Sequence, residues 1–448
     1  MKPVSRKLLT ALALGGALVV TSCGMFGSGR DRAAEEAAEQ AGRIAMVLGD
    51  DTLVADPELA TRSVILPAAE TLDAWTEAGS RPSKAVGHIL AADDLQVAWR
   101  RDAGEGSSRN AALTTAPVAN QNHIYVLDAD QTVRAFDLQT GSPTWRHEVD
   151  SGSRRDKVGI GGGLALTGDT LIVSSGYGLV LALDAETGAL KWSRATEAPM
   201  TGAPTIKDGR IFVTSNNNEV LALSLADGEL EWSDQAISES ARVLSSPSPA
   251  AVEDIVVVPY SSGEVIAYLA SNGRRLWSDA LSRPGRFTPI SAINDIAARP
   301  VLAGGLVIVA NQSGVTAAID GRSGTRIWAQ TIGSTQAPAL AGDYVFIAGT
   351  DGMLAALDAS SGRVYWATQM RRYRDQEDEK GRLSYSGPII ASGRVIVISS
   401  EGDLIAYDPQ TGQEVDTLDL GDKVYLEPIA VNETLYVLTD DARLIAIR

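Results

Sequence analysis

LVLALDAETGALKW, at residues 179–192, is the clearest copy of a pattern that repeats along the chain. In it an apolar strand ends in an acidic residue, a polar turn closes on glycine, and tryptophan follows four residues later. Tryptophan follows six of the seven turn glycines, and Asp416 takes its place after the last. The glycines are spaced by 38 to 51 residues, about 45 on average, and stand at Gly141, Gly188, Gly228, Gly273, Gly324, Gly362 and Gly412.

A period near 45 residues, filled with short apolar or alternating strands, predicts the four-stranded blade of a β-propeller. Seven turns define seven complete blades. Residues 424–448 hold only three further strand-like stretches, whereas residues 95–99 have the character of the missing outermost strand. The sequence therefore predicts an all-β fold over residues 95–448, an eight-bladed propeller of four-stranded antiparallel blades in which an N-terminal strand completes the last blade and removes exposed edges.

The turn and the tryptophan each have a physical role. In the recurring Asp-x-x-Thr/Ser-Gly turn the aspartate accepts hydrogen bonds within the turn, and glycine supplies the positive φ. A tryptophan on the outermost strand can place its ring between neighbouring blades, burying ~150–250 Å². We expect inter-blade packing from Trp99, Trp145, Trp192, Trp232, Trp277, Trp328 and Trp366, with a loss of ~3–5 kcal/mol on replacement by alanine.

The N-terminus carries features of export. Three cations without an acid precede an apolar run over residues 8–20, which is too short to span a membrane but suits a signal peptide. Val20-Thr21-Ser22-Cys23 follows and resembles the bacterial lipobox. We expect cleavage after residue 22 and lipidation of Cys23. Residues 23–94 then form a lipidated tether and an extended segment without a domain of their own. Gly24 follows the cysteine instead of the aspartate that retains enteric lipoproteins in the inner membrane, which favours the outer membrane.

Composition excludes several function classes. The 448 residues include 39 Lys and Arg, 56 Asp and Glu, three His and one Cys, for a net charge of −17. A polyanion such as nucleic acid would be repelled. One cysteine allows no intrachain disulfide and no multi-cysteine metal site. The histidines are scattered, and we expect no metal, no cofactor and no catalytic residues.

The motif Ala-Leu-Asp-x-x-Thr-Gly-x-x-x-Trp resembles the pyrroloquinoline-quinone-type propeller repeat. Together with the lipobox, the Pro67 and Trp75 preamble and eight blades, the chain resembles the BamB family of outer-membrane lipoproteins. The resemblance implies a non-catalytic scaffold on the periplasmic face of the outer membrane. Such a scaffold binds the POTRA repeats of BamA, joins the other subunits of the β-barrel assembly machinery and assists insertion of barrel proteins. Unfolded outer-membrane proteins are further candidate partners.

The resemblance also indicates where the partner binds, since the family docks BamA through loops between central blades. The matching stretches here are residues 242–246 and 293–300, with Arg242, Leu244 and Asp295 as candidate contacts. Ala297 departs from the second aspartate of the family's Asp-x-Asp pattern, and Arg242 and Leu244 are only approximately in register.

Two other functions stay open. The chain could be a periplasmic propeller that binds a sugar or a peptide. It could also be a quinoprotein dehydrogenase, since those enzymes share the repeat. They are longer, however, and resemblance to them would imply a vicinal Cys–Cys disulfide, which a chain with one cysteine cannot form.

Overall fold

The computed structural model describes residues 53–152, 159–237, 247–281 and 295–448. Contacts divide the chain into Met1–Asp51 and Thr52–Arg448, and every described residue belongs to the second unit. All regular elements among the described residues are β-strands. Within the same residues, no helix is long and apolar enough to cross a bilayer.

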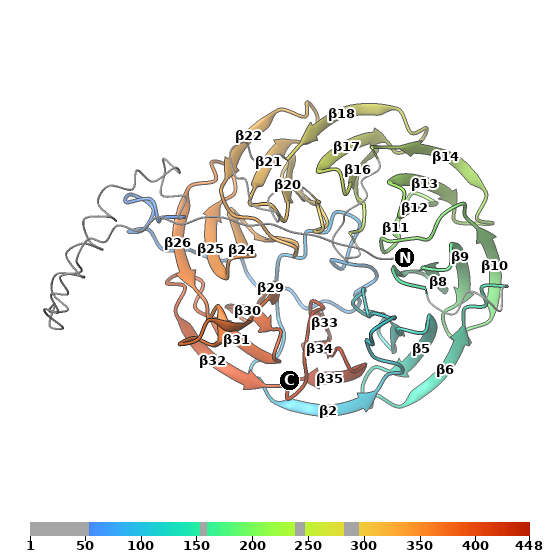
Figure 1. Ribbon diagram of the computed structural model, residues 1–448, viewed down its shortest axis with the longest axis horizontal. Helices are drawn as coiled ribbons and strands as arrows, with labels where there is room; N and C mark the ends of the chain where they lie inside the picture. Colours follow the sequence, from blue (N-terminus) through green and yellow to red (C-terminus); the bar gives the residue numbers. More distant parts are fainter. Residues whose placement is uncertain (1–52, 153–158, 238–246, 282–294) are drawn as a thin grey trace, which may run out of the picture. The chain divides into compact units, whose positions relative to one another are not determined.

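Eight four-stranded antiparallel sheets surround a common axis as blades (Figure 1). From the innermost strand outward, blade 1 consists of β3 (Val118–Ala119), β4 (His123–Leu127), β5 (Thr132–Asp137) and β6 (Pro143–Glu148), and blade 2 of β7 (Gly162–Thr167), β8 (Thr170–Ser175), β9 (Leu179–Asp184) and β10 (Leu190–Ala195). Blade 3 consists of β11 (Thr205–Lys207), β12 (Arg210–Thr214), β13 (Glu219–Ser224) and β14 (Leu230–Gln235), and blade 4 of β15 (Ala250–Val252), β16 (Ile255–Pro259), β17 (Glu264–Leu269) and β18 (Arg275–Ala280).

The second half of the ring follows the same plan. Blade 5 consists of β19 (Val301–Ala303), β20 (Leu306–Ala310), β21 (Thr316–Asp320) and β22 (Arg326–Gln330), and blade 6 of β23 (Ala339–Ala341), β24 (Tyr344–Ala348), β25 (Met353–Asp358) and β26 (Val364–Gln369). Blade 7 consists of β29 (Tyr385–Ala391), β30 (Arg394–Ser399), β31 (Asp403–Tyr407) and β32 (Glu414–Asp419), and blade 8 of β33 (Ile429–Val431), β34 (Thr434–Leu438), β35 (Arg443–Ile447) and β2 (Val97–Asp102). A hairpin of β27 (Tyr373–Asp375) and β28 (Lys380–Arg382) stands between blades 6 and 7.

The predicted closure of the ring is confirmed. Strand β2 pairs antiparallel with β35, with Val97 opposite Ile447 and Asp102 opposite Arg443. The backbones of Gln96 and Arg448 exchange two hydrogen bonds of 2.9 Å just beyond the ladder. The last blade therefore takes three strands from the C-terminus and its outermost strand from residues 97–102.

Burial follows position within the blade. The second and third strands are almost wholly buried, as in β16 and β20, because neighbouring blades cover both of their faces. The outermost strands alternate between exposed and less exposed residues, since one face meets solvent. Strands of the inner positions are accordingly continuous runs of Val, Ile, Leu and Ala, whereas the outer strands carry Lys, Arg, Asp and Glu.

Five of the turns between the third and fourth strands are held by their aspartate as the sequence predicts, and Ser224 and Leu269 take the place of the aspartate in the other two. In blade 2 the Asp184 Oδ1 atom accepts hydrogen bonds from the Thr187 amide at 2.9 Å and the Thr187 hydroxyl at 2.8 Å. These bonds lower the pKa of Asp184, with the Thr187 hydroxyl as the largest contribution. Gly188 closes the turn with φ of +72°.

In every blade except blade 7, the tryptophan of the outermost strand lies on the turn of the next blade. A Cβ on Gly188 would stand 2.5 Å from the Trp145 ring, and the Trp145 Nε1 donates to the Ala185 carbonyl at 3.0 Å. The other six predicted tryptophans make the equivalent bond, to the carbonyls of Gln139, Leu225, Ala270, Gly321, Ala359 and Pro409. Tryptophan and turn glycine thus form one packing unit that joins consecutive blades.

Blade 7 has Asp416 where the other blades have tryptophan, and the structure explains why. Asp416 pairs with Ala406 at the register that tryptophan occupies in the other blades, where Trp366 pairs with Ala356. The next blade is the composite one, in which the third strand β35 ends at the C-terminus and β2 comes from far away in the sequence. No chain connects these two strands, so blade 8 has no turn glycine on which a ring at position 416 could pack.

Residues 53–95, which we call the strap, begin beside the outermost strand β26 of blade 6 and then run across the axis of the ring (Figure 1). Strap carbonyls of Thr76, Pro82 and Ser83 accept hydrogen bonds from the amides of Leu166, Ala251 and Leu302, on the innermost strands of blades 2, 4 and 5. Trp75 and Ala119 exchange two backbone bonds in blade 1. Strand β1 (His88–Ile89) pairs parallel with β29 of blade 7. The strap therefore covers strand edges that would otherwise face the axis unpaired.

The strap also contributes side chains to the interior of the protein. The side chains of Trp75 and Ile89 are buried, with 1% and 0% of their surface exposed. Glu77 and Lys84 form a buried ion pair, with 4% and 0% of their side chains exposed. Burial raises the pKa of Glu77 and lowers the pKa of Lys84, against the opposing attraction within the pair.

Candidate functional site

The two ends of the propeller differ in the segments that they carry. The turns between strands 1 and 2 and between strands 3 and 4 lie at one end, which we call the turn face. The turns between strands 2 and 3, and every connection between blades, lie at the other end, which we call the connection face. This follows from the antiparallel order of strands in every blade. The strap bonds to the turn-face ends of the innermost strands, so it crosses the axis toward that end.

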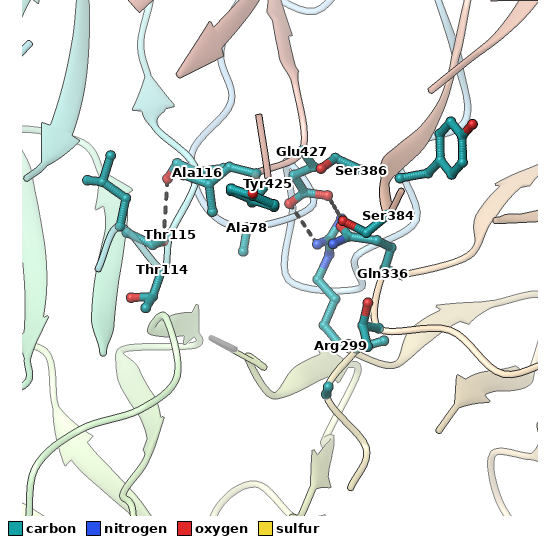
Figure 2. A pocket seen from close by; sticks show the side chains of 17 residues that line it. Ala78, Thr114, Thr115, Ala116, Arg299, Gln336, Ser384, Ser386, Tyr425 and Glu427 are labelled. Carbon is teal, nitrogen blue, oxygen red and sulfur yellow. Dashed lines mark hydrogen bonds and ion pairs between the residues drawn. The ribbon is translucent and has the colours of Figure 1, made fainter. Parts of the chain in front are cut away.

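A cavity of about 240 Å³ lies at the connection-face ends of the innermost strands. Five inter-blade connections, those that lead into blades 1, 5, 6, 7 and 8, supply its walls, and Ala78 of the strap contributes as well. Figure 2 shows these side chains converging from different blades. Its polar lining consists of Thr114, Thr115, Arg299, Thr335, Gln336, Ser384, Tyr385, Ser386, Tyr425 and Glu427. We call it the axial cavity.

An ion pair occupies the middle of the lining. Arg299 donates from both terminal nitrogens to the two carboxylate oxygens of Glu427, at 2.6 and 2.5 Å. Only 14% and 15% of these side chains are exposed. The Arg299 Nε makes no hydrogen bond among the described residues and faces Gly79, where a Cβ would lie 2.7 Å away. Because both charges are paired in a fork geometry, the lining is close to electrically neutral.

Several polar side chains of the lining offer hydrogen-bonding groups to the cavity. Ser386, which is only 2% exposed, contributes a hydroxyl. Gln336 contributes a side-chain amide and Thr114 a second hydroxyl, and the Gln336 backbone amide bonds to Ser334. Figure 2 shows Gln336 and Ser386 on the same side of the cavity as Arg299 and Glu427. These groups are therefore available to water or to a bound molecule.

The predicted partner contacts are only partly within the described residues. Arg242 and Leu244 lie outside them, in residues 238–246. Asp295 is described and is 4% exposed. Its carbonyl accepts a hydrogen bond from the Gln312 amide at 3.1 Å, which ties the segment to the turn after β20. Asp295 belongs to the described part of the connection into blade 5, on the connection face.

The three histidines lie on three different segments of the chain. His88 lies on the strap, His123 on β4 and His147 on β6, each bonded or close to a different neighbour. No group of three His, Cys, Asp or Glu that could hold a metal ion occurs among these residues.

A family model described as "Outer membrane protein assembly factor BamB" matches residues 82–156, 150–368 and 374–448. The chain belongs to the BamB family. Curated BamB relatives include those of Moranella endobia, 25% identical over 222 residues, and Escherichia coli K12, 27% identical over 241 residues. These alignments cover 49% and 53% of this chain and 57% and 61% of the relatives. The first residues of the strap, 53–81, precede the part that the family model matches.

Solved structures agree on the fold. BamB from Moraxella catarrhalis superposes with a TM-score of 0.65 at 18% identity, covering 79% of this chain and 99% of that structure. Quinohemoprotein alcohol dehydrogenase from Comamonas testosteroni gives the same TM-score at 14% identity, covering 84% and 81%. At such identities both likenesses concern the propeller alone. Sequence reasoning missed the axial cavity, because its residues share no motif and come together only through blades far apart in the chain. It also missed the Glu77–Lys84 pair, whose two residues lie seven positions apart on the strap without a recognisable motif.

Proposed function

We propose that this chain is a non-catalytic scaffold of the outer-membrane β-barrel assembly machinery. Membership of the BamB family supports this role, and the relatives that carry the same propeller are named as assembly factors. The observation that carries it is the family match over residues 82–156, 150–368 and 374–448, which together include strands of all eight blades. The mature chain begins at Cys23, is anchored by lipid to the outer membrane and faces the periplasm. Several acyl chains make such an anchor stable, whereas one would be marginal.

The proposed partner is BamA, bound through its POTRA repeats, in company with the other subunits of the machinery. The connection face is the surface we assign to it, because its inter-blade loops vary in length and sequence, whereas the turns of the other face are uniform. Variable loops on a rigid scaffold are where binding specificity usually lies. Arg242 and Leu244 are the proposed contacts. Asp295 is buried, so its proposed contribution is to hold the loop in shape.

Recovery of BamA from detergent-solubilised envelopes tests this surface. The variant Arg242→Glu with Leu244→Asp reverses one charge and introduces another, and we expect at least about a tenfold loss of recovered BamA, as for central interface residues. The matched control, Arg274→Glu with Leu230→Asp, makes the same changes in a turn-face loop and on the outer rim, where both side chains are exposed. Equal recovery with both variants would remove the two residues from the interface.

A quinoprotein dehydrogenase is the contrasting function. Its support is the shared propeller alone, at 14% identity. The chain has one cysteine, so it cannot form the disulfide that such enzymes place over the quinone. The one guanidinium of the axial cavity is already paired with Glu427. These features favour the scaffold.

A further inference from the structure

We propose that the axial cavity is a binding site for a small, uncharged, hydroxyl-rich molecule the size of one sugar ring. Nothing in the BamB relationship assigns a ligand to this place. The cavity lining includes Ala297, Ala298 and Arg299 of the stretch 293–300, but not Arg242, Leu244 or Asp295.

Size is the first constraint on the ligand. Sites for drug-sized molecules occupy ~300–1,000 Å³, whereas the axial cavity holds about 240 Å³. It therefore holds a single ring with its substituents, whereas a dinucleotide, an extended peptide or a large cofactor would extend out of it. The same space would hold about eight water molecules at ~30 Å³ each.

Charge is the second constraint. The Arg299–Glu427 pair is close to neutral as a unit, and the cavity lining has no further charged side chain. A charged ligand would lose its hydration without gaining an unpaired counter-charge, which is unfavourable in a partly buried site. The pair itself still offers hydrogen bonds, because a guanidinium has five N–H donors and the carboxylate oxygens have further lone pairs. A planar pair with spare donors and acceptors suits adjacent hydroxyl groups.

Polar groups of the lining complete the site. Ser386 is nearly inaccessible from outside the protein, and it lines the cavity together with Gln336, so a hydroxyl and an amide are presented to an occupant. Buried polar groups are hydrogen-bonded as a rule, so they favour an occupant that hydrogen-bonds to them. Tyr425 is 44% exposed at the same cavity and supplies an aromatic face against which a sugar ring can pack. The strap contributes Ala78 to the wall.

Calorimetric titration and saturation-transfer NMR of the purified full chain test the proposal. The neutral probes are methyl α-D-glucoside and N-acetylglucosamine, and the charged probes are glucuronate and pyrroloquinoline quinone. We expect saturable binding of at least one neutral probe. Binding should be at least about tenfold weaker in both Ser386→Ala and Gln336→Leu, since each removes a hydrogen-bonding group from the site. It should be unchanged in Gln410→Leu, the same substitution at an exposed turn-face residue.

Three outcomes would overturn the proposal. The first is the absence of binding by both neutral probes at millimolar concentration, which would make the cavity a water-filled space. The second is tighter binding of a charged probe than of either neutral one. The third is binding that Ser386→Ala and Gln336→Leu leave unchanged although thermal melts show both variants folded. None of these outcomes alters the expected recovery of BamA, so failure here is distinguishable from failure of the scaffold function.

Discussion

At the scale of single residues, glycine and tryptophan act together. Gly188 is required for two reasons, namely its φ of +72° and the Trp145 ring against its α-carbon. The same pairing recurs at the other six turns. The local sequence predicts the first reason, because a tight turn needs positive φ. The second reason depends on a residue of the preceding blade, 43 positions away in this case (188 − 145). We propose that these seven contacts are the main adhesion between blades.

Two glycine substitutions distinguish the cost of positive φ in a turn from the cost of a clash with the tryptophan ring. Gly188→Ala and Gly168→Ala both place a side chain at positive φ, +72° and +56°, which costs ~1–2 kcal/mol. A Cβ at position 168 meets nothing within 4 Å, whereas one at 188 meets the Trp145 ring at 2.5 Å. We therefore expect Gly188→Ala to lose a further ~1–3 kcal/mol of unfolding free energy through overpacking. Denaturant unfolding of both variants measures the difference, and equal losses would show that the ring contact adds nothing.

At the scale of elements, the strap is held by one buried ion pair and by backbone bonds to the innermost strands. Those strands are short, with two residues in β3 and three in β11, β15 and β19. Such short strands have few ladder bonds of their own, and the strap adds bonds on their free edges. The short strap segment from Glu77 to Lys84 thereby links parts of the ring that are distant in the chain.

Removing one member of the pair should loosen the strap. Lys84→Met leaves the Glu77 carboxylate buried without its partner, and we expect a loss of ~3–5 kcal/mol. The double variant Glu77→Leu with Lys84→Met replaces both charges by apolar groups and should be close to the parent protein in stability. Hydrogen exchange reports on the strap directly, because the amides of Ala251 and Leu302 donate to strap carbonyls.

We expect faster exchange at these two amides in Lys84→Met and protection like that of the parent in the double variant. If exchange in Lys84→Met matched the parent, the ion pair would not be what holds the strap.

At the scale of the whole molecule, the ring has one seam, which is the place in blade 8 where the two ends of the propeller chain meet. Asp416, which stands where the other blades have tryptophan, lies beside this seam in blade 7. Blade 8 combines the C-terminal strands β33 to β35 with β2, and so lacks the turn that every other blade offers to its neighbour's tryptophan. The chain ends meet there through the Gln96 and Arg448 backbone bonds.

A tryptophan at this seam should therefore be of no benefit. We expect Asp416→Trp to change the free energy of unfolding by less than ~0.5 kcal/mol, the usual range for a surface position. Trp366→Asp, the reverse change one blade earlier, removes a ring that is 7% exposed and bonded to the Pro409 carbonyl. It should cost ~3–5 kcal/mol. Thermal melts of the two variants check this, and a clear gain from Asp416→Trp would contradict the explanation of the seam.

Blade number, strand order within a blade and the closure of the ring could all be predicted from the chain alone, because each depends on local patterns. Strand alternation, turn residues and the spacing of glycine and tryptophan repeat within about 45 residues, and the count leaves one strand to come from residues 95–99. The course of the strap, the Glu77–Lys84 pair and the axial cavity with Arg299 and Glu427 could not be predicted. Their residues carry no shared motif, and only the closing of eight blades around one axis brings the five inter-blade connections and the strap together.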